Sequence, residues 1–356
     1  MVLVKKINVE EFNLINEMKN KKNIDMQKCL ELLSDIKDIT DLLPKKSKMT
    51  VSFELLQTNA DIANGIRRCL VDELEIKSFD FDEYNDIDTS DRYILCDFIK
   101  KQIDLLPINQ EYDYTGVNIM LMKENNTDEI IDVTSDDFII SGEAKQKDLE
   151  KIVSGNIVIC KLRPGEYIKI NNIKICSGIN RDNGAKFNSV SNITYKILDA
   201  DPIVETRIGK TGVSSMLSNP KHFFISYSTH RNIENPLKFM VLCCVTLITR
   251  LEYILKDMKN ITNSDTEYFS KLLTLETTGD LKKVYIKGEY WTIINMICRY
   301  CYILTDSNIK FVSASLIHPE KEVGVVNIRH PEFSTLIQNS IKKIISELII
   351  IKAAFS

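Results

Sequence analysis

The segment between residues 236 and 257 constrains the fold more than any other part of the chain. Apolar residues occupy most of the circumference of a helix there, and Pro236 stands where helices commonly begin. A helix that is apolar on most sides must be buried on more than one side. Its longest nearly apolar run, from Phe239 to Ile248, is far shorter than the ~18 residues that a membrane span requires. The segment therefore predicts a helix in a bundle core or a dimer-like interface, and no contact with a membrane.

A strand–turn–helix unit occurs twice, and a long apolar helix follows each copy. In the first copy, Val51 and Phe53 alternate with polar residues, and a helix with an apolar stripe follows. In the second copy, a strand with Val284 and Ile286 runs through a turn into a helix from 292 to 302. Apolar residues from 333 to 348 recur every three or four positions and predict the second long helix.

The first helices of the two copies share a local pattern, which reads Asn64-x-Ile66-x-Arg68 in one and Asn295-x-Ile297-x-Arg299 in the other. Chance produces such a pattern easily, but here both occurrences follow a strand at the same place. Two related halves, each with a helix too apolar to stand alone, are expected to pack on one another.

The region between the two copies is rich in short strands. Alternating apolar runs occur near residues 117–121, 157–159, 167–170 and 173–175, and turn residues such as Pro164-Gly165 separate them. The acidic stretch from 78 to 90 lacks periodicity and predicts a loop with a short extended segment. We therefore expect a small β-rich domain, inserted between the first helix and the segments that complete the first half.

Charge and cysteine content restrict the classes of function. The net charge is −4 and the pI about 5.8, whereas proteins that wrap nucleic acid normally carry a basic excess. Contact with DNA or RNA is therefore expected only through other proteins. The nine cysteines are scattered, and Cys243, Cys244, Cys298 and Cys301 fall in apolar helical stretches, which predicts free thiols in a reducing compartment. The N-terminus turns polar too early for a signal peptide.

Patterns that could indicate catalysis or ligand binding are incomplete. Gly209-Lys210-Thr211 is similar to the end of a phosphate-binding loop, but Val204 stands where that motif requires glycine. Cys298-x-x-Cys301 has a metal-ligand spacing without a second pair of ligands nearby. The four histidines are dispersed. We predict no catalytic residue, no cofactor and no metal site.

Two segments of the first half resemble the α-type assembly subunits of multisubunit RNA polymerases. The run Asn64-Gly65-Ile66-Arg67-Arg68 resembles that family's N-A-L-R-R helix. Downstream, residues 98–108 are similar to the family's F-I-A-H-R-L-G-L-I-P-L element, with Pro107 kept. Lys101, Gln102 and Asp104 depart from the usual His, Arg and Gly, so the polar contacts of the family are not carried over there.

Later segments resemble two different members of that family. Residues 178–187 are similar to the G-I-G-K-E-H-A-K-W loop of the third subunit of eukaryotic polymerase II and the archaeal D subunit, with one extra residue and no histidine. Residues 291–295 stand where the eleventh subunit, or archaeal L, has H-T-L-G-N, although Trp291 and Ile294 replace His and Gly. His318-Pro319 matches the H-P of that subunit.

Segments similar to both subunits occur on one chain. This arrangement resembles the fused third/eleventh-type subunit of large nucleocytoplasmic DNA viruses, of the African swine fever virus and mimivirus kind. Residues 214–222 also look like the connector of such viral subunits. The resemblance implies an α+β fold with two dimerisation domains paired within one chain. The implied division is an N-terminal extension at 1–48, a third-subunit-like dimerisation domain at 49–77 and 191–258, an inserted β-rich domain at 78–190, a linker at 259–270, and an eleventh-subunit-like dimerisation domain at 271–356.

The function implied by the resemblance is that of a non-catalytic scaffold in a viral DNA-directed RNA polymerase, in the virion and the host cytoplasm. Its partners would be the two largest subunits and small zinc-bearing subunits, and intrachain pairing would replace a heterodimer. The residues implied to bind partners are Asn64, Arg67, Arg68, Asn295 and Arg299. From the residues alone, Arg67 and Arg68 fit equally well at the solvated edge of an amphipathic helix. A free-standing regulatory or nucleic-acid-binding module is the alternative function.

Overall fold

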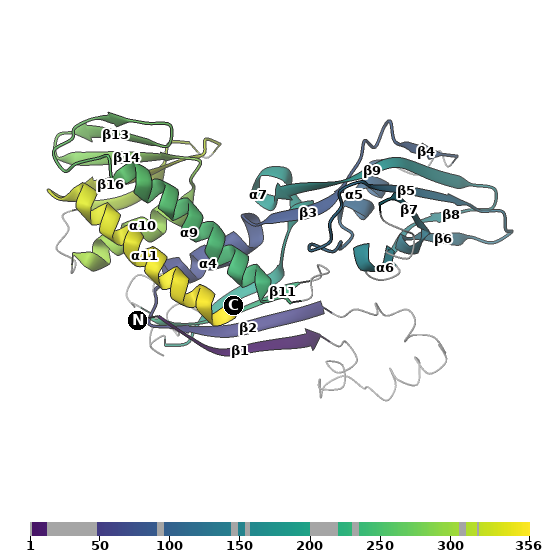
Figure 1. Ribbon diagram of the computed structural model, residues 1–356, viewed down its shortest axis with the longest axis horizontal. Coiled ribbons are helices and arrows are strands. Elements are labelled where there is room, and N and C mark those ends of the chain that lie inside the picture. Colours follow the sequence, from purple (N-terminus) through teal and green to yellow (C-terminus); the bar gives the residue numbers. More distant parts are fainter. Residues whose placement is uncertain are drawn as a thin grey trace, which may run out of the picture.

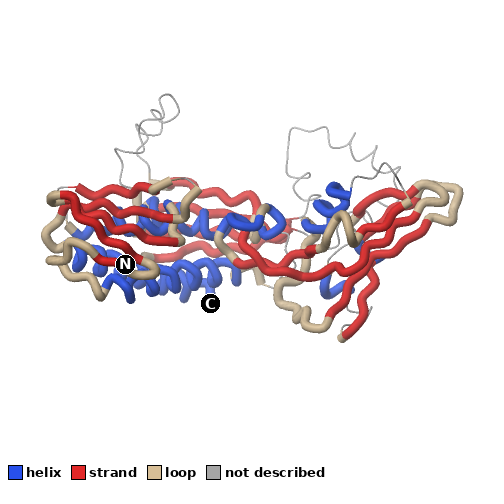
Figure 2. Tube along the Cα trace, turned by 90° about the horizontal axis from the view of Figure 1, so that it is seen from above, coloured by secondary structure: helices blue, strands red, loops and turns tan. Residues whose placement is uncertain are grey.

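The protein has an α+β fold, as the sequence predicted, and is elongated with two parts (Figure 1). The computed structural model describes residues 2–12, 48–90, 96–143, 149–153, 157–199, 220–229, 235–305, 311–318 and 320–356. Most of the predicted N-terminal extension at 1–48, the Gly209–Thr211 motif and most of the predicted connector at 214–222 lie outside these residues. Figure 2 shows the long helices in one part, whereas the other part consists mainly of strands.

The first sheet has four antiparallel strands in the order β1-β2-β11-β10. Val51, Phe53 and Leu55 are fully buried because alternate residues of β2 face the core. Residues 3–12, which we placed in an N-terminal extension, add β1 to this sheet. A register shift between Lys5 and Asn8 breaks the alternation of β1, so its sequence has no clear strand pattern. The strands are β1 (Leu3–Phe12), β2 (Lys48–Leu56), β10 (Ser191–Ile197) and β11 (His222–Thr229).

The second sheet has five antiparallel strands in the order β12-β13-β14-β16-β15. Val284 and Ile286 face the core from β14, as the alternation predicted. Residues 259–270, the predicted linker, lead from the first long helix into β12 and lie against the start of the last helix, where Asn263 accepts hydrogen bonds from backbone N–H groups. The strands are β12 (Tyr268–Phe269), β13 (Leu273–Thr278), β14 (Leu281–Lys287), β15 (Phe311–Leu316) and β16 (Val323–Arg329).

Four helices join the two sheets into one core. They are α4 (Ala60–Asp72), α9 (Lys238–Met258), α10 (Trp291–Leu304) and α11 (Phe333–Phe355). The two long helices α9 and α11 lie side by side, and α4 packs on α10 (Figure 1). Asn59 begins α4 by accepting hydrogen bonds from the backbone N–H groups of Asp61 and Ile62. At the far end of the core, the rings of Phe53 on β2 and Phe355 on α11 meet edge to face, with centroids 4.8 Å apart.

Buried apolar side chains form two separate clusters. The larger one contains residues of both sheets and of α4, α9, α10 and α11, and it draws on the chain between 2 and 76 and between 187 and 355. The smaller one lies between Phe79 and Ile173. Segments far apart in the sequence therefore share one core, which is what pairing of two halves within the chain requires.

The smaller cluster belongs to the strand-rich part. Its main sheet has the order β3-β9-β5-β7 with β4 against β9, and β6 pairs with β8. The runs 167–170 and 173–175, predicted as two strands, form the single strand β9. Asn172 has a positive φ of 52° there, and this bulge interrupts the alternation that a sequence pattern needs. The strands are β3 (Glu75–Asp80), β4 (Ile87–Thr89), β5 (Val117–Glu124), β6 (Ile131–Thr134), β7 (Phe138–Gly142), β8 (Val158–Leu162) and β9 (Tyr167–Ile179).

Short helices complete this part. The apolar frame predicted around Pro107 forms α5, in which Ile99 and Ile103 are fully buried. The short helices are α5 (Cys96–Asp104), α6 (Leu149–Ile152) and α7 (Asn180–Asn183), with 3-10 turns η1 (Ser135–Asp137) and η3 (Ala185–Phe187).

Candidate interaction surfaces

The predicted partner-binding residues of the first half lie on α4. Asn64, Arg67 and Arg68 are all half-buried. The Nε atom of Arg67 donates a hydrogen bond to Oδ1 of Asn64 at 2.9 Å, which fixes its guanidinium. Arg68 forms no hydrogen bond or ion pair with any described residue, so its five donors are available to a partner.

The predicted residues of the second half lie on α10, which crosses α4. Nε of Arg299 is 3.8 Å from Oδ2 of Asp61 on α4, and its guanidinium lies 5.9 Å from the ring centre of Tyr302. Burial raises the pKa of Asp61, and the charge of Arg299 opposes this effect. The structure thus places Arg299 in a contact between the two repeated helices, and Asn295 is half-buried on the same helix.

A buried polar network, which the sequence did not reveal, joins the halves beside this crossing. Arg250 on α9 donates hydrogen bonds to Glu73 at the end of α4 and to Glu289 just before α10. The hydroxyl of Thr292 donates to Oε1 of Glu73 at 2.9 Å. The side chains of Glu73 and Glu289 are only 5% and 7% exposed. The sequence offered one signal for such a network, which is that Arg250 lies in the most apolar predicted helix. A charged residue buried there requires partners of opposite charge.

The charges in this network depend on one another. Burial alone would lower the pKa of Arg250, but its hydrogen bonds to Glu289 and the charge of Glu73 raise it above the ordinary value. Burial raises the pKa of Glu289, and Arg250 opposes this effect while Glu73 adds to it, because two carboxylates share one guanidinium. Removal of Arg250 would leave two buried carboxylates without a cation.

The loop at 178–187 connects the strand-rich part with both halves. Nδ2 of Asn180 donates to the backbone oxygen of Val71 at 3.3 Å, at the end of α4. The guanidinium of Arg181 lies 4.8 Å from the ring centre of Tyr290, and its Nη2 is 3.9 Å from Oε1 of Glu322. This loop therefore fixes the end of α4 against the second sheet.

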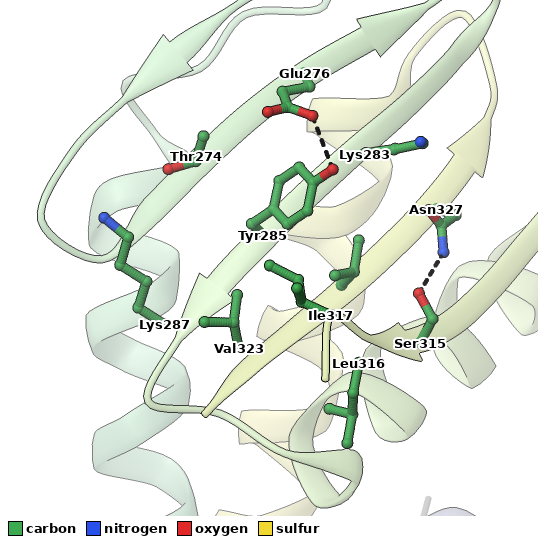
Figure 3. A pocket seen from close by; sticks show the side chains of 11 residues that line it. Thr274, Glu276, Lys283, Tyr285, Lys287, Ser315, Leu316, Ile317, Val323 and Asn327 are labelled. Atoms are coloured by element: carbon green, nitrogen blue, oxygen red, sulfur yellow. Dashed lines mark hydrogen bonds between the residues drawn. The ribbon is translucent and has the colours of Figure 1, made fainter. Parts of the chain in front are cut away.

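A shallow groove lies on the outer face of the second sheet, away from the helices (Figure 3). Its volume is about 520 Å³, and Tyr285 lies in its middle, with its hydroxyl donating to Oε2 of Glu276 at 2.8 Å. Burial and this carboxylate raise the pKa of Tyr285 to about 12. The groove is lined by Thr274, Glu276, Lys283, Tyr285, Lys287, Ser315, Leu316, Ile317, Val323, Val325 and Asn327. The groove has an apolar floor and is flanked by Lys283 and Lys287. It therefore suits a partner segment that presents an apolar side chain with carboxylates beside it.

The four thiols predicted to lie in apolar helical stretches are packing groups. Cys243, Cys244, Cys298 and Cys301 are buried in the larger cluster and form no disulfide. Burial raises the pKa of Cys244 to about 12 and that of Cys301 to about 11, which makes neither a nucleophile near neutral pH. Across the described residues, no group of three or more His, Cys, Asp or Glu side chains could hold a metal ion. In the same part of the chain, no helix is both long and apolar enough to cross a membrane.

Comparison of the sequence with models of protein families found no match, and comparison with curated proteins found none either.

Proposed function

We propose that this chain is the non-catalytic assembly scaffold of a DNA-directed RNA polymerase from a large nucleocytoplasmic DNA virus. The observation that carries the proposal is the packing of α4 on α10, the two helices that bear the repeated Asn-x-Ile-x-Arg pattern. Two subunit-like halves that share a core within one chain correspond to the fused third/eleventh-type arrangement that the motifs resemble.

Two separate surfaces support a scaffold that holds two large partners. Arg67 and Arg68 on α4 belong to the first half, and we assign them to the second-largest subunit. The groove around Tyr285 belongs to the second half, and we assign it to the largest subunit, on which the family's active-site metal lies. Small zinc-bearing subunits would bind the assembled complex, which operates in the virion and the host cytoplasm.

The experiment that tests this function is affinity purification of the tagged chain from infected cells, with mass spectrometry of the proteins that remain bound. We expect the two largest polymerase subunits in near-equal amounts. Recovery of the chain alone or with unrelated proteins would overturn the proposal. If a titration with duplex DNA showed binding with a steep salt dependence, the free-standing nucleic-acid-binding module would replace it.

Variants separate the two assigned surfaces. Arg67→Ala with Arg68→Ala should reduce recovery of the second-largest subunit, and Lys283→Glu with Lys287→Glu should reduce recovery of the largest. The matched control is Lys174→Ala with Lys196→Ala, which removes two exposed lysines from β9 and β10. This control should retain both large subunits. Equal losses in all three double variants would mean that neither surface is specific.

A further inference from the structure

The outer side of the two long helices exposes an unusual amount of apolar surface. Leu242, Val245 and Tyr253 on α9 are 47%, 38% and 64% exposed, and Ile349 on α11 is 51% exposed. The three residues of α9 lie on one side of the helix and form a stripe, in which Thr249 and Glu252 are also exposed. Figure 1 shows both helices on the same side of the molecule, with no described element over them.

The neighbouring helices α9 and α11 run antiparallel, which sets the level of Ile349 relative to the stripe of α9. At one end, Nε2 of Gln338 donates to the backbone oxygen of Met258 at 3.1 Å. Towards the other end, the charge of Lys352 acts on the thiol of Cys244. Ile349 lies one turn before Lys352 on α11, so along the helix axes it lies within about one turn of the level of Val245. We name this surface the α9–α11 face, defined by Leu242, Val245, Tyr253 and Ile349.

Positive charge predominates among the ionisable side chains of α9 and α11. The two helices, both described in full, carry five lysines and a single exposed acidic side chain, Glu252. Lys238 pairs with Glu111 and Lys343 with Glu347. The other three, Lys256, Lys342 and Lys352, form no ion pair with a described residue. The whole chain has a net charge of −4, so this concentration of cations is local.

Exposed apolar residues on two helices with an excess of lysines favour one kind of partner over others. Nucleic acid would use the lysines but would leave Leu242, Val245 and Ile349 without an apolar contact. An amphipathic helix with carboxylates beside its apolar side would satisfy both features. From Leu242 to Tyr253 the stripe is about 16 Å long, which corresponds to roughly three turns of such a helix.

We propose that the α9–α11 face binds an acidic amphipathic helix of a partner protein. The apolar side of that helix covers Leu242, Val245 and Ile349, and its carboxylates approach Lys342 and Lys352. This face consists of other residues than Arg67, Arg68 and the lining of the groove around Tyr285, so its role goes beyond the scaffold contacts and is tested by different variants.

The test is a titration of the full chain with a labelled helix-forming peptide of about 18 residues that carries leucine on one side and glutamate on the other. Fluorescence anisotropy measures its affinity, and a peptide with lysine in place of glutamate is the comparison. We expect the acidic peptide to bind about tenfold more tightly, and the difference to shrink as salt rises. Equal affinities, or no binding of the acidic peptide, would overturn the proposal.

Variants locate the site. Val245→Glu or Ile349→Glu should weaken binding of the acidic peptide about tenfold, because each places a carboxylate in the apolar stripe. Met122→Glu, at a 56% exposed position on β5, is the control and should bind as the wild type does. Lys342→Glu with Lys352→Glu should reverse the preference in favour of the lysine peptide. Equal melting temperatures would show that all variants fold.

Three other outcomes would assign the face to a different occupant. Tighter binding to anionic phospholipid vesicles than to the peptide would identify a membrane surface. Stronger binding of duplex DNA, lost in Lys342→Glu with Lys352→Glu, would identify nucleic acid. A dimer of the chain alone in sedimentation velocity that Ile349→Glu dissociates would identify a second copy. Each of these would overturn the proposed acidic helix.

Discussion

Gly65 on α4 lies directly against Met296 on α10, so that a Cβ atom at position 65 would be 3.0 Å from the sulfur of Met296. The two helices that carry the repeated pattern therefore meet at a position where one of them has no side chain. The contact depends on a glycine in the middle of a helix, where glycine costs about 1 kcal/mol relative to alanine.

Substitution of Gly65 should show how tightly this crossing is packed. Gly65→Val should lower the free energy of unfolding by about 1–3 kcal/mol, because the branched side chain overpacks the crossing. In Gly65→Ala, the gain in helix propensity should offset much of the displacement of the flexible Met296 side chain. Urea unfolding measures both, and Ala353→Val at an exposed position of α11 is the control. A Gly65→Val variant as stable as the wild type would contradict the close approach.

Loss of Arg250 should destabilise the pairing of the halves strongly. Arg250→Met should lower the free energy of unfolding by about 3–5 kcal/mol, because Glu73 and Glu289 would remain buried without a cation. The triple variant that adds Glu73→Gln and Glu289→Gln should recover part of this loss, since it removes the buried charges. Urea unfolding of the three proteins measures the effect. The prediction fails if the triple variant is less stable than Arg250→Met.

The long helices and the repeated units could be predicted because their apolar residues recur with a clear period. The helix at 238–258 begins within two residues of the predicted start, and Phe333, Ile337 and Ile341 are buried as their spacing indicated. The spacing of apolar residues is a local property of the sequence. It predicts which residues are buried when one side of a helix or strand packs on a core.

The missed features depend on irregular backbone or on distant residues. The strand β1 was missed because Lys6 adopts a positive φ of 53° and interrupts the alternation. The network was missed because Glu73 and Arg250 lie 177 residues apart, and no spacing rule connects them. The groove around Tyr285 arises from side chains of four strands that only the sheet order brings together.

Acidification should weaken the attachment of β1. Glu54 on β2 accepts from Nζ of Lys6 at 2.7 Å and lies 3.0 Å from Nε2 of His222. The hydrogen bond from Lys6 lowers the pKa of Glu54, burial opposes this, and His222 adds to the lowering. A lowered folded-state pKa gives stability that is present above the ordinary value of 4.5 and lost as the pH falls through the folded-state pKa.

Hydrogen exchange of the β1 amides at several acidic pH values would measure this effect. After correction for the intrinsic exchange rate, protection in the wild type should fall as the pH decreases below 4.5. In Glu54→Gln this fall should be smaller, because the ionised carboxylate is already missing. Glu320→Gln, at a side chain that is 89% exposed, is the control and should behave as the wild type does. Identical profiles for Glu54→Gln and the wild type would contradict the role of Glu54.

Cleavage between the halves should leave them associated, because the core and not the connection holds them together. Thr266 and Glu267 are exposed and lie between α9 and β12, beyond Asn263, which contacts α11. We expect the intact chain to be monomeric in sedimentation velocity. A protease site inserted between Thr266 and Glu267 and then cut should give two fragments that migrate as one particle.

Pairing becomes bimolecular after the cut, so dissociation should appear on dilution, whereas a short linker supplies an effective concentration of roughly millimolar. Arg250→Met should raise the concentration at which the fragments separate, and Ala353→Val should not. Immediate separation of the fragments, or a stable symmetric dimer of the uncut chain, would show that the two halves do not pair within one polypeptide.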